Sequence, residues 1–350
     1  MTITTSHAPR RSASAATFRP AQPRLDVHQA ITNKIIAAIE RGAGEWKMPW
    51  HRPGAHFTIP KNALTQQHYR GSNILSLWVD AEEKAFTRQI WATYRQWSEL
   101  GAQVRKGEKA SLIVKYGSWT PKEARNPEPA SEDSGDDEQN PQRLYSKAAW
   151  VFNAAQIDGF SPPEIAPRPD LTERLDHVED FIANTRAQIS YGGARAFYRH
   201  PPADIIVLPP RSAFEPTATS TATETFYGTL LHECSHWTGA LHRLNREHGK
   251  RFADEAYAFE ELVAEISSGI LCAELGISSS LREDHVQYLA HWLAILKGDK
   301  KAIFAAAGQA TRVSDFLFAL QPGAQPRGID SAGDPRQFTS PINQPGATHG

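Results

Sequence analysis

The chain has 350 residues, long enough for two domains, and its formal net charge is −1, so overall charge does not indicate a nucleic-acid partner. Only two cysteines occur, Cys234 and Cys272, which excludes a disulfide framework and fits a reducing compartment. No apolar run is long enough to cross a membrane, and there is no signal-peptide pattern. We therefore expect a cytoplasmic protein without a membrane partner.

Composition divides the chain into two folded units with polar segments around them. Residues 1–24 lack acidic side chains and are expected to form a disordered arm. The first unit is expected over residues 25–160, interrupted by a loop at 121–143; within that loop, positions 126–140 carry six acids and no base. The remaining boundaries are a proline-rich linker at 161–170, a second unit at 171–320 and a disordered tail at 321–350.

The first unit combines tryptophans with basic residues. Six of the nine tryptophans precede residue 120, and residues 25–117 carry 13 Lys/Arg against 8 Asp/Glu. Basic groups can follow phosphates while exposed rings stack on unpaired bases, so this mixture suits single-stranded nucleic acid. Tryptophans of a small domain also commonly fill its core. Composition alone leaves both interpretations open.

The second unit is predicted to contain helices and a small sheet. A helix at Leu171–Ala187 precedes strands near Arg195–Tyr198 and Asp204–Leu208, and two further pairs of helices follow. The predicted fold class is α+β with two domains. We expect the C-terminal domain to pack these helices against the small sheet.

The segment from His232 to His242 contains the pattern H-E-x-x-H. On a helix, residues four apart lie on one face, so His232 and His236 can direct imidazole nitrogens toward one metal ion, with Glu233 beside them. Apolar residues gather on the opposite side of the segment: Phe226, Tyr227, Leu230, Leu231, Cys234 and Trp237. Motif and helical phase therefore both predict a metal site rather than a solvated helix face.

The third metal ligand has two candidates. His242 extends the pattern as in metzincins, but the methionine turn of those enzymes is missing because no methionine follows residue 48. Glu261 and Glu265 lie on the next predicted helix, opposite its apolar face. They resemble the gluzincin pattern, which implies Glu261 as the zinc ligand and Glu265 as the residue that orients a ligating histidine. His242 is the runner-up. Glu260 ranks below both, because at about 100° per residue it points away from the side of the helix that carries Glu261 and Glu265.

This ligand set predicts the chemistry of a zinc hydrolase. Zn²⁺ with an open coordination position lowers the pKa of its water to about 7 and polarises a carbonyl, while Glu233 takes the water proton and passes it to the leaving amine. The predicted reaction is hydrolysis of a peptide bond. A small sheet beside an active-site helix is the arrangement of zincin-like metallopeptidases, so we expect that fold for the C-terminal domain.

Residues 25–160 resemble the N-terminal domain of ArdC-type antirestriction proteins. The resemblance rests on six segments: Ile31–Glu40, Trp46 with Pro49-Trp50, Pro60–Asn62, Tyr69–Asn73, Trp91–Gln96 and Gly101–Glu108. The second half is similar to the family's zincin-like domain at His232–Arg246 and Phe259–Ile277. The family implies binding of single-stranded DNA and protection of incoming plasmid DNA during conjugation. Within family-like segments or close to them, Arg70, Trp91, Arg95, Lys106 and Lys109 are the candidate DNA contacts.

Two classes of function follow from these observations. In one, the protein binds single-stranded DNA, with double-stranded DNA as a further candidate, and cleaves a protein such as a restriction subunit. In the other, it shields DNA without catalysis, with a structural zinc, or assists plasmid or phage DNA replication. Glu233 favours the enzyme, since a purely structural site has no need for a general base.

Overall fold

The computed structural model describes seven stretches of the chain: residues 25–43, 58–119, 143–161, 171–216, 221–246, 255–277 and 289–325. The expected N-terminal arm lies outside them, as do the acidic loop up to residue 142, the linker from residue 162 and the tail from residue 326. None of the helices in the described stretches is long and apolar enough to span a bilayer.

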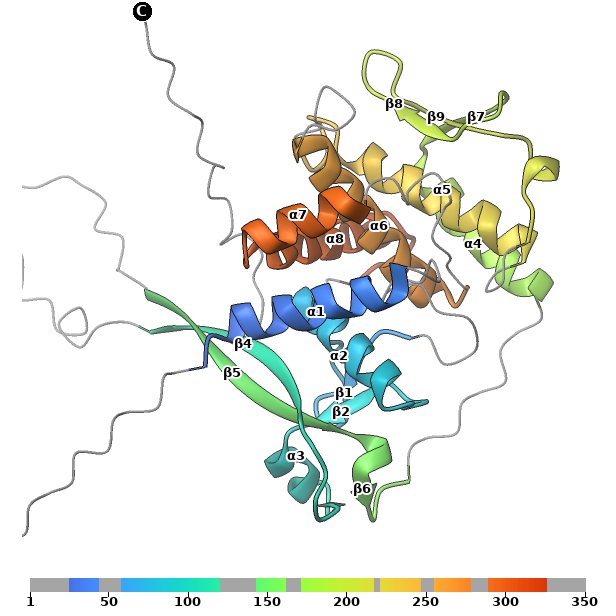
Figure 1. Cartoon of the computed structure of the whole chain (residues 1–350). Helices are drawn as coiled ribbons and strands as arrows, with labels where there is room; N and C mark the ends of the chain where they lie inside the picture. The colour runs from blue at the N-terminus through green and yellow to red at the C-terminus, as the bar shows by residue number, and fades with distance from the viewer. Residues whose placement is uncertain are drawn as a thin grey trace, which may run out of the picture.

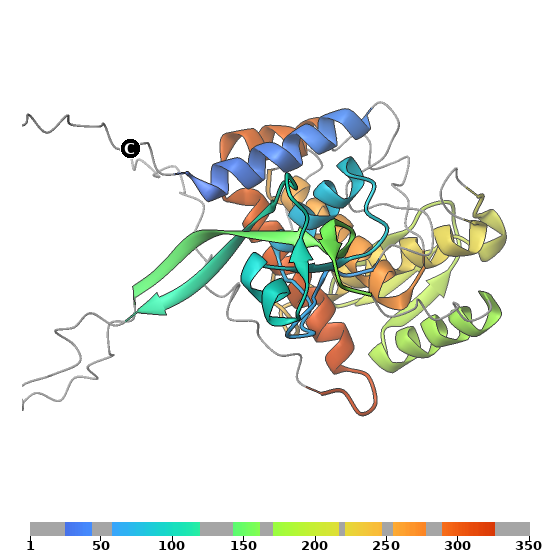
Figure 2. The ribbon, with the colours of Figure 1, turned by 90° about the horizontal axis from the view of Figure 1, so that it is seen from below.

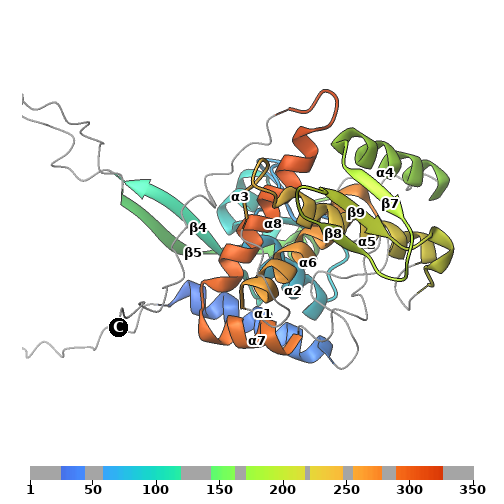
Figure 3. The ribbon, with the colours of Figure 1, turned by 90° about the horizontal axis from the view of Figure 1, so that it is seen from above.

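The first unit places three helices around a small sheet (Figure 1). Its elements are α1 (Val27–Ala43), β1 (Lys61–Asn62), α2 (Ser72–Glu83), β2 (Ile90–Ala92), α3 (Tyr94–Glu99), β3 (Gln103–Val104), β4 (Ser111–Trp119), β5 (Arg143–Asn153) and β6 (Ile157–Asp158). Four strands form a sheet in the order β1-β2-β5-β4, while β3 pairs with β6. Strands β4 and β5 form a long antiparallel hairpin whose outer end extends past the helices in all three views (Figures 1–3).

The second unit has the predicted mixture of helices and a small sheet. Its elements are α4 (Leu171–Thr185), β7 (Gln188–Tyr191), β8 (Phe197–Arg199), β9 (Ile205–Leu208), α5 (Ala222–Thr238), α6 (Glu255–Leu275), α7 (Leu289–Gly298) and α8 (Ala302–Ala319). The strands are ordered β7-β9-β8, with β7 parallel and β8 antiparallel to β9. The α+β class is confirmed, and β7 is a strand that the sequence pattern did not predict.

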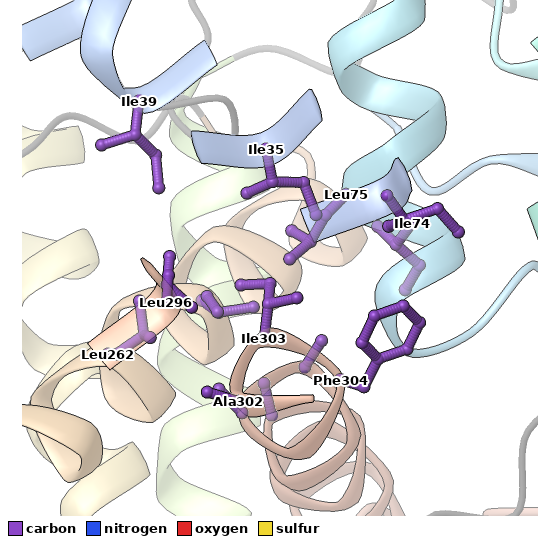
Figure 4. Close-up of a cluster of buried hydrophobic side chains, with 14 of the residues drawn as sticks. Ile35, Ile39, Ile74, Leu75, Leu262, Leu296, Ala302, Ile303 and Phe304 are labelled. Atoms are coloured by element: carbon purple, nitrogen blue, oxygen red, sulfur yellow. The ribbon is translucent and has the colours of Figure 1, made fainter. Parts of the chain in front are cut away.

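The two units share a hydrophobic core. Figure 4 shows Ile35 of α1 and Leu75 of α2 directed toward Leu262 of α6 and Ile303 of α8. All four side chains are buried in one cluster, which also includes residues of α7. Polar contacts cross the same boundary, because Thr32 donates a hydrogen bond to the Lys300 carbonyl at 2.7 Å and Arg70 forms an ion pair with Asp315. Helices α7 and α8 pack against α1 and α2 as well as against α6, and so connect the first unit to α6.

Candidate metal centre

Helix α5 holds the H-E-x-x-H residues in a fixed position. Thr221 and Glu224 form a capping box at its start, in which the Thr221 hydroxyl accepts from the Glu224 amide at 3.2 Å and the Glu224 carboxylate accepts from the Thr221 amide at 3.1 Å. The predicted apolar face is buried in a cluster with residues of the small sheet and of α6. This packing fixes the opposite face, where His232, Glu233 and His236 lie.

The three residues indicated by the sequence as ligands come together between α5 and α6. The Nε2 atoms of His232 and His236 lie 3.1 Å apart, and they lie 3.5 Å and 3.6 Å from the two carboxylate oxygens of Glu261. Two nitrogens bound to one tetrahedral zinc at about 2.0–2.1 Å are roughly 3.3 Å apart. The spacing of these donor atoms, and their nitrogen and oxygen chemistry, fit one metal ion.

Each histidine is held by a different glutamate through its other ring nitrogen. His232 Nδ1 lies 3.1 Å from Glu265, the partner expected from the gluzincin pattern. His236 Nδ1 lies 3.2 Å from Glu260, and the Arg246 guanidinium donates to both oxygens of Glu260 at 2.8 Å and 3.0 Å. Such contacts set the tautomer and the orientation of a ligating ring.

Sequence reasoning missed the roles of Glu260 and Arg246. Helical phase places Glu260 on a different side of α6 from Glu261, which argued against a role in the same site. His236, however, lies one turn beyond His232 on α5, and its second ring nitrogen needs a partner of its own. The doublet Glu260-Glu261 was the available signal, because adjacent residues on α6 can reach the ligand position and the second histidine. Arg246 follows the end of α5 at Thr238 and carried no periodic signal.

The electrostatics of the site favour a cation. Burial lowers the pKa of His236, but the charge of Glu261 and hydrogen bonds to Glu260 and Glu261 outweigh it and raise that pKa to about 10. Burial raises the pKa of Glu260, yet Arg246 and His236 bring it down to about 2. The Glu260 and Glu261 carboxylates are thus kept ionised in the interior around the two imidazoles. A divalent cation bound between the rings would take the place of their protons.

The other candidate ligand lies elsewhere. His242 is 58% exposed at its side chain, and its Nε2 is 3.5 Å from Asp204 and 2.6 Å from the Arg243 guanidinium. Within the described stretches, the donor atoms that gather closely enough for one metal ion come from His232, His236 and Glu261, and His242 is not among them.

The candidate DNA contacts differ in their exposure. Arg95, Lys106 and Lys109 are exposed on the first unit, although Arg95 also forms an ion pair with Glu99 at 2.9 Å. Arg70 is directed instead to Asp315 of α8.

Trp91 requires a correction. Its side chain is 0% exposed, and its indole N–H donates to Gln89 at 3.2 Å, so the ring cannot stack on a base. Among the described side chains of this unit, the large exposed rings are those of Tyr94 and Trp150, which are 54% and 50% exposed.

Two family models match the chain. Residues 25–152 match the N-terminal domain of anti-restriction factor ArdC, and residues 176–309 match a zincin-like metallopeptidase. The match boundaries follow the order of the two units, with the candidate metal residues inside the second match.

Known relatives cover most of the chain. Uncharacterized protein y4eC of Sinorhizobium fredii (strain NBRC 101917 / NGR234) is 41% identical over 309 residues, which are 88% of this chain and 97% of that protein. Two Escherichia coli proteins named DNA primase TraC are 32% and 35% identical over 86% of this chain. The chain spans only 20% and 28% of those two primases.

Solved structures give the same relationship. The metal-free structure of antirestriction protein ArdC from the R388 plasmid has a TM-score of 0.65 and 37% identity, covering 85% of this chain and 98% of that chain. Its Mn(II)-bound structure has a TM-score of 0.66 and 35% identity, covering 86% and 100%. The chain belongs to the ArdC family of antirestriction proteins, with an ArdC-type N-terminal domain and a zincin-like metallopeptidase domain.

Proposed function

We propose that this protein protects incoming plasmid DNA during conjugation by binding single-stranded DNA with its first unit and hydrolysing a protein with its second. The observation that carries the enzymatic part is the closely spaced donor set of buried His232, half-buried His236 and buried Glu261 beside Glu233. A restriction-system component is the candidate substrate, because destroying it would complete the protection that DNA binding begins.

We propose Zn²⁺ as the resident metal. Two imidazole nitrogens and one carboxylate make a common donor set of catalytic zinc sites, in which the fourth position holds water. The Mn(II)-bound ArdC structure makes manganese the competing candidate. Elemental analysis of protein purified without added metal tests the choice, with one zinc per chain expected and stoichiometric manganese contradicting it.

In this proposal the side chains divide the work of hydrolysis. A metal bound here supplies Lewis acidity and lowers the pKa of a coordinated water. Glu233 accepts the proton of the attacking water and delivers it to the leaving amine nitrogen, which balances the proton transfer. Glu265 and Glu260 hold the two imidazoles so that both Nε2 atoms keep their shared direction.

The DNA-binding part is supported by the match to the ArdC N-terminal domain and by the exposed basic groups of this unit. Arg95, Lys106 and Lys109 remain proposed contacts, whereas Arg70 would first have to leave Asp315. Trp91 is not among the proposed contacts, because its ring is buried.

A second candidate is a DNA-handling protein without catalysis, in which the metal stabilises the fold. The similarity to the TraC primases favours this alternative, because a region like this chain is present in proteins named for DNA priming. Its expected activity is shielding of single strands or assistance to plasmid or phage replication.

One conjugation experiment separates the two candidates. An unmodified plasmid is transferred into a restricting host that expresses the wild-type protein, Glu233→Ala or no protein. Loss of protection with Glu233→Ala, at unchanged metal content and thermal stability, supports hydrolysis. Equal protection by both proteins supports shielding, and no protection by the wild type contradicts the antirestriction proposal.

A further inference from the structure

The outer half of the β4–β5 hairpin carries positive charge that nothing in either strand balances. Lys115 lies on β4, Lys147 lies on β5, and neither strand contains an aspartate or glutamate. The inner end of β5 also pairs with β2, through Phe152 and Asn153. The residues at the outer end of β4 and β5 pair with each other, in the part of the hairpin that extends past the helices (Figure 3).

Strand register places two lysines side by side. Lys115 is directly opposite Lys147, and Gly117 is directly opposite Tyr145. Side chains alternate along a strand, so these residues share one face of the hairpin. Both lysines are exposed. Like charges at directly opposed positions destabilise a strand pair, and an anion bound between them removes that repulsion.

Tyr145 organises this face. A Cβ atom at Gly117 would lie 2.5 Å from the Tyr145 ring, so the ring rests against the backbone there and would have to move for a larger residue. The Lys147 ammonium lies 4.6 Å from the centroid of the same ring. A cation–π contact of this kind limits the conformations of the lysine.

The other face of the hairpin is directed toward the body of the protein. Tyr116 is half-buried against the shared core, and its hydroxyl lies 3.3 Å from His28 of α1. The lysine face is therefore the one available to a ligand at this point of the hairpin.

We propose that Lys115, Tyr145 and Lys147 form a binding surface for the phosphodiester backbone of single-stranded DNA. This inference rests on the proposed DNA-binding function and assigns part of it to a surface inside the region that matches the ArdC N-terminal domain but outside the five residues proposed from the sequence. Charge complementarity is the first argument, because two adjacent ammonium groups match the phosphates of a flexible strand. The position of these side chains, on the face of the hairpin opposite Tyr116, is the second, because it leaves both ammonium groups exposed to a ligand.

The experiment is a titration of the full-length, metal-loaded protein with a fluorescein-labelled oligo(dT), followed by anisotropy at several salt concentrations. The test variant is Lys115→Ala/Lys147→Ala. The matched control, Lys297→Ala/Lys301→Ala, removes the same charge from α7 and the start of α8. Lys115→Arg/Lys147→Arg restores the charge on the hairpin, and thermal melting of every variant verifies the fold.

For two lost phosphate contacts on a single strand, the slope of log affinity against log salt should decrease in magnitude by about 1.4. The same relation gives roughly a tenfold weakening near physiological salt for the alanine pair. The control and the arginine pair should bind like the wild type. Gly117→Ala, which displaces the Tyr145 ring without changing charge, should give a smaller loss.

Wild-type affinity and slope for the alanine pair would overturn this assignment while leaving DNA binding itself intact. Absence of oligo(dT) binding by the wild type would overturn the proposed function as well. Titration with a duplex of equal length distinguishes the occupant, because a loss seen only with duplex would replace the single strand with double-stranded DNA.

Discussion

The metal centre and the hairpin both hold like charges close together, but in different surroundings. Glu260, Glu261 and Glu265 are buried on one helix, where Arg246 supplies opposite charge and the two imidazoles supply polar partners from within the protein. Lys115 and Lys147 face each other on an exposed ribbon, where water weakens their repulsion. Buried like charges need oppositely charged or hydrogen-bonding partners within the protein. Exposed like charges can instead be neutralised by a ligand that binds from solution. The first region is thus preorganised and the second is adaptable.

The largest expected effect concerns Glu233, the carboxylate on α5 that is proposed to move protons. Glu233→Gln should reduce hydrolysis by about 10³-fold, because general acid–base catalysis contributes roughly 10²–10⁴-fold. Metal content, measured by elemental analysis, should not change. Full activity in Glu233→Gln would show that the interior site does not use this carboxylate.

The next effect compares a buried tryptophan with an exposed one. Trp91→Ala should reduce the free energy of unfolding by about 3–5 kcal/mol, because it removes a fully buried ring. Trp150→Ala should leave stability within about 0.5 kcal/mol and weaken oligo(dT) binding by about 1–3 kcal/mol. Urea denaturation and anisotropy measure the two quantities. The reverse pattern would restore Trp91 as a DNA contact.

The metal-site residues were predictable from the sequence, whereas the burial of these two tryptophans was not. His232, His236, Glu261 and Glu265 were predictable because each pair lies one helical turn apart, and a helix fixes which side chains share a face. Burial of a particular tryptophan depends on segments distant in sequence, so composition could not separate Trp91 from Trp150. The shared core had no local signal either, since the apolar face of α6 is the same whatever it packs against.

A smaller effect is expected at the two glutamates that orient the histidines. Glu260→Gln and Glu265→Gln should each lower metal affinity by about 10–100-fold, because each supports one ligating ring. Competition with a chromogenic chelator measures the affinity. A loss confined to Glu265→Gln would indicate that Glu260 serves only to hold Arg246.

The smallest effect is expected when a substitution reverses the sign of one charge on the hairpin. Lys115→Glu places a carboxylate opposite Lys147 and should stabilise the strand pair by about 0.2–1 kcal/mol. Oligo(dT) binding should become weaker in the same variant. Chemical denaturation and anisotropy provide the two readings, and a decrease in stability would contradict the like-charge interpretation.

The core that α1 and α2 share with α6, α7 and α8 bears on folding and on ancestry. Because α7 and α8 pack on the first unit and also on α6, which carries the glutamates of the metal centre, we expect both halves to melt in a single cooperative transition. A fragment cut at the linker would expose a large apolar surface and aggregate. Homologous regions in y4eC and the TraC primases span 307 to 312 residues, encompassing both halves each time. The two halves therefore occur together in these relatives, including the much longer primases.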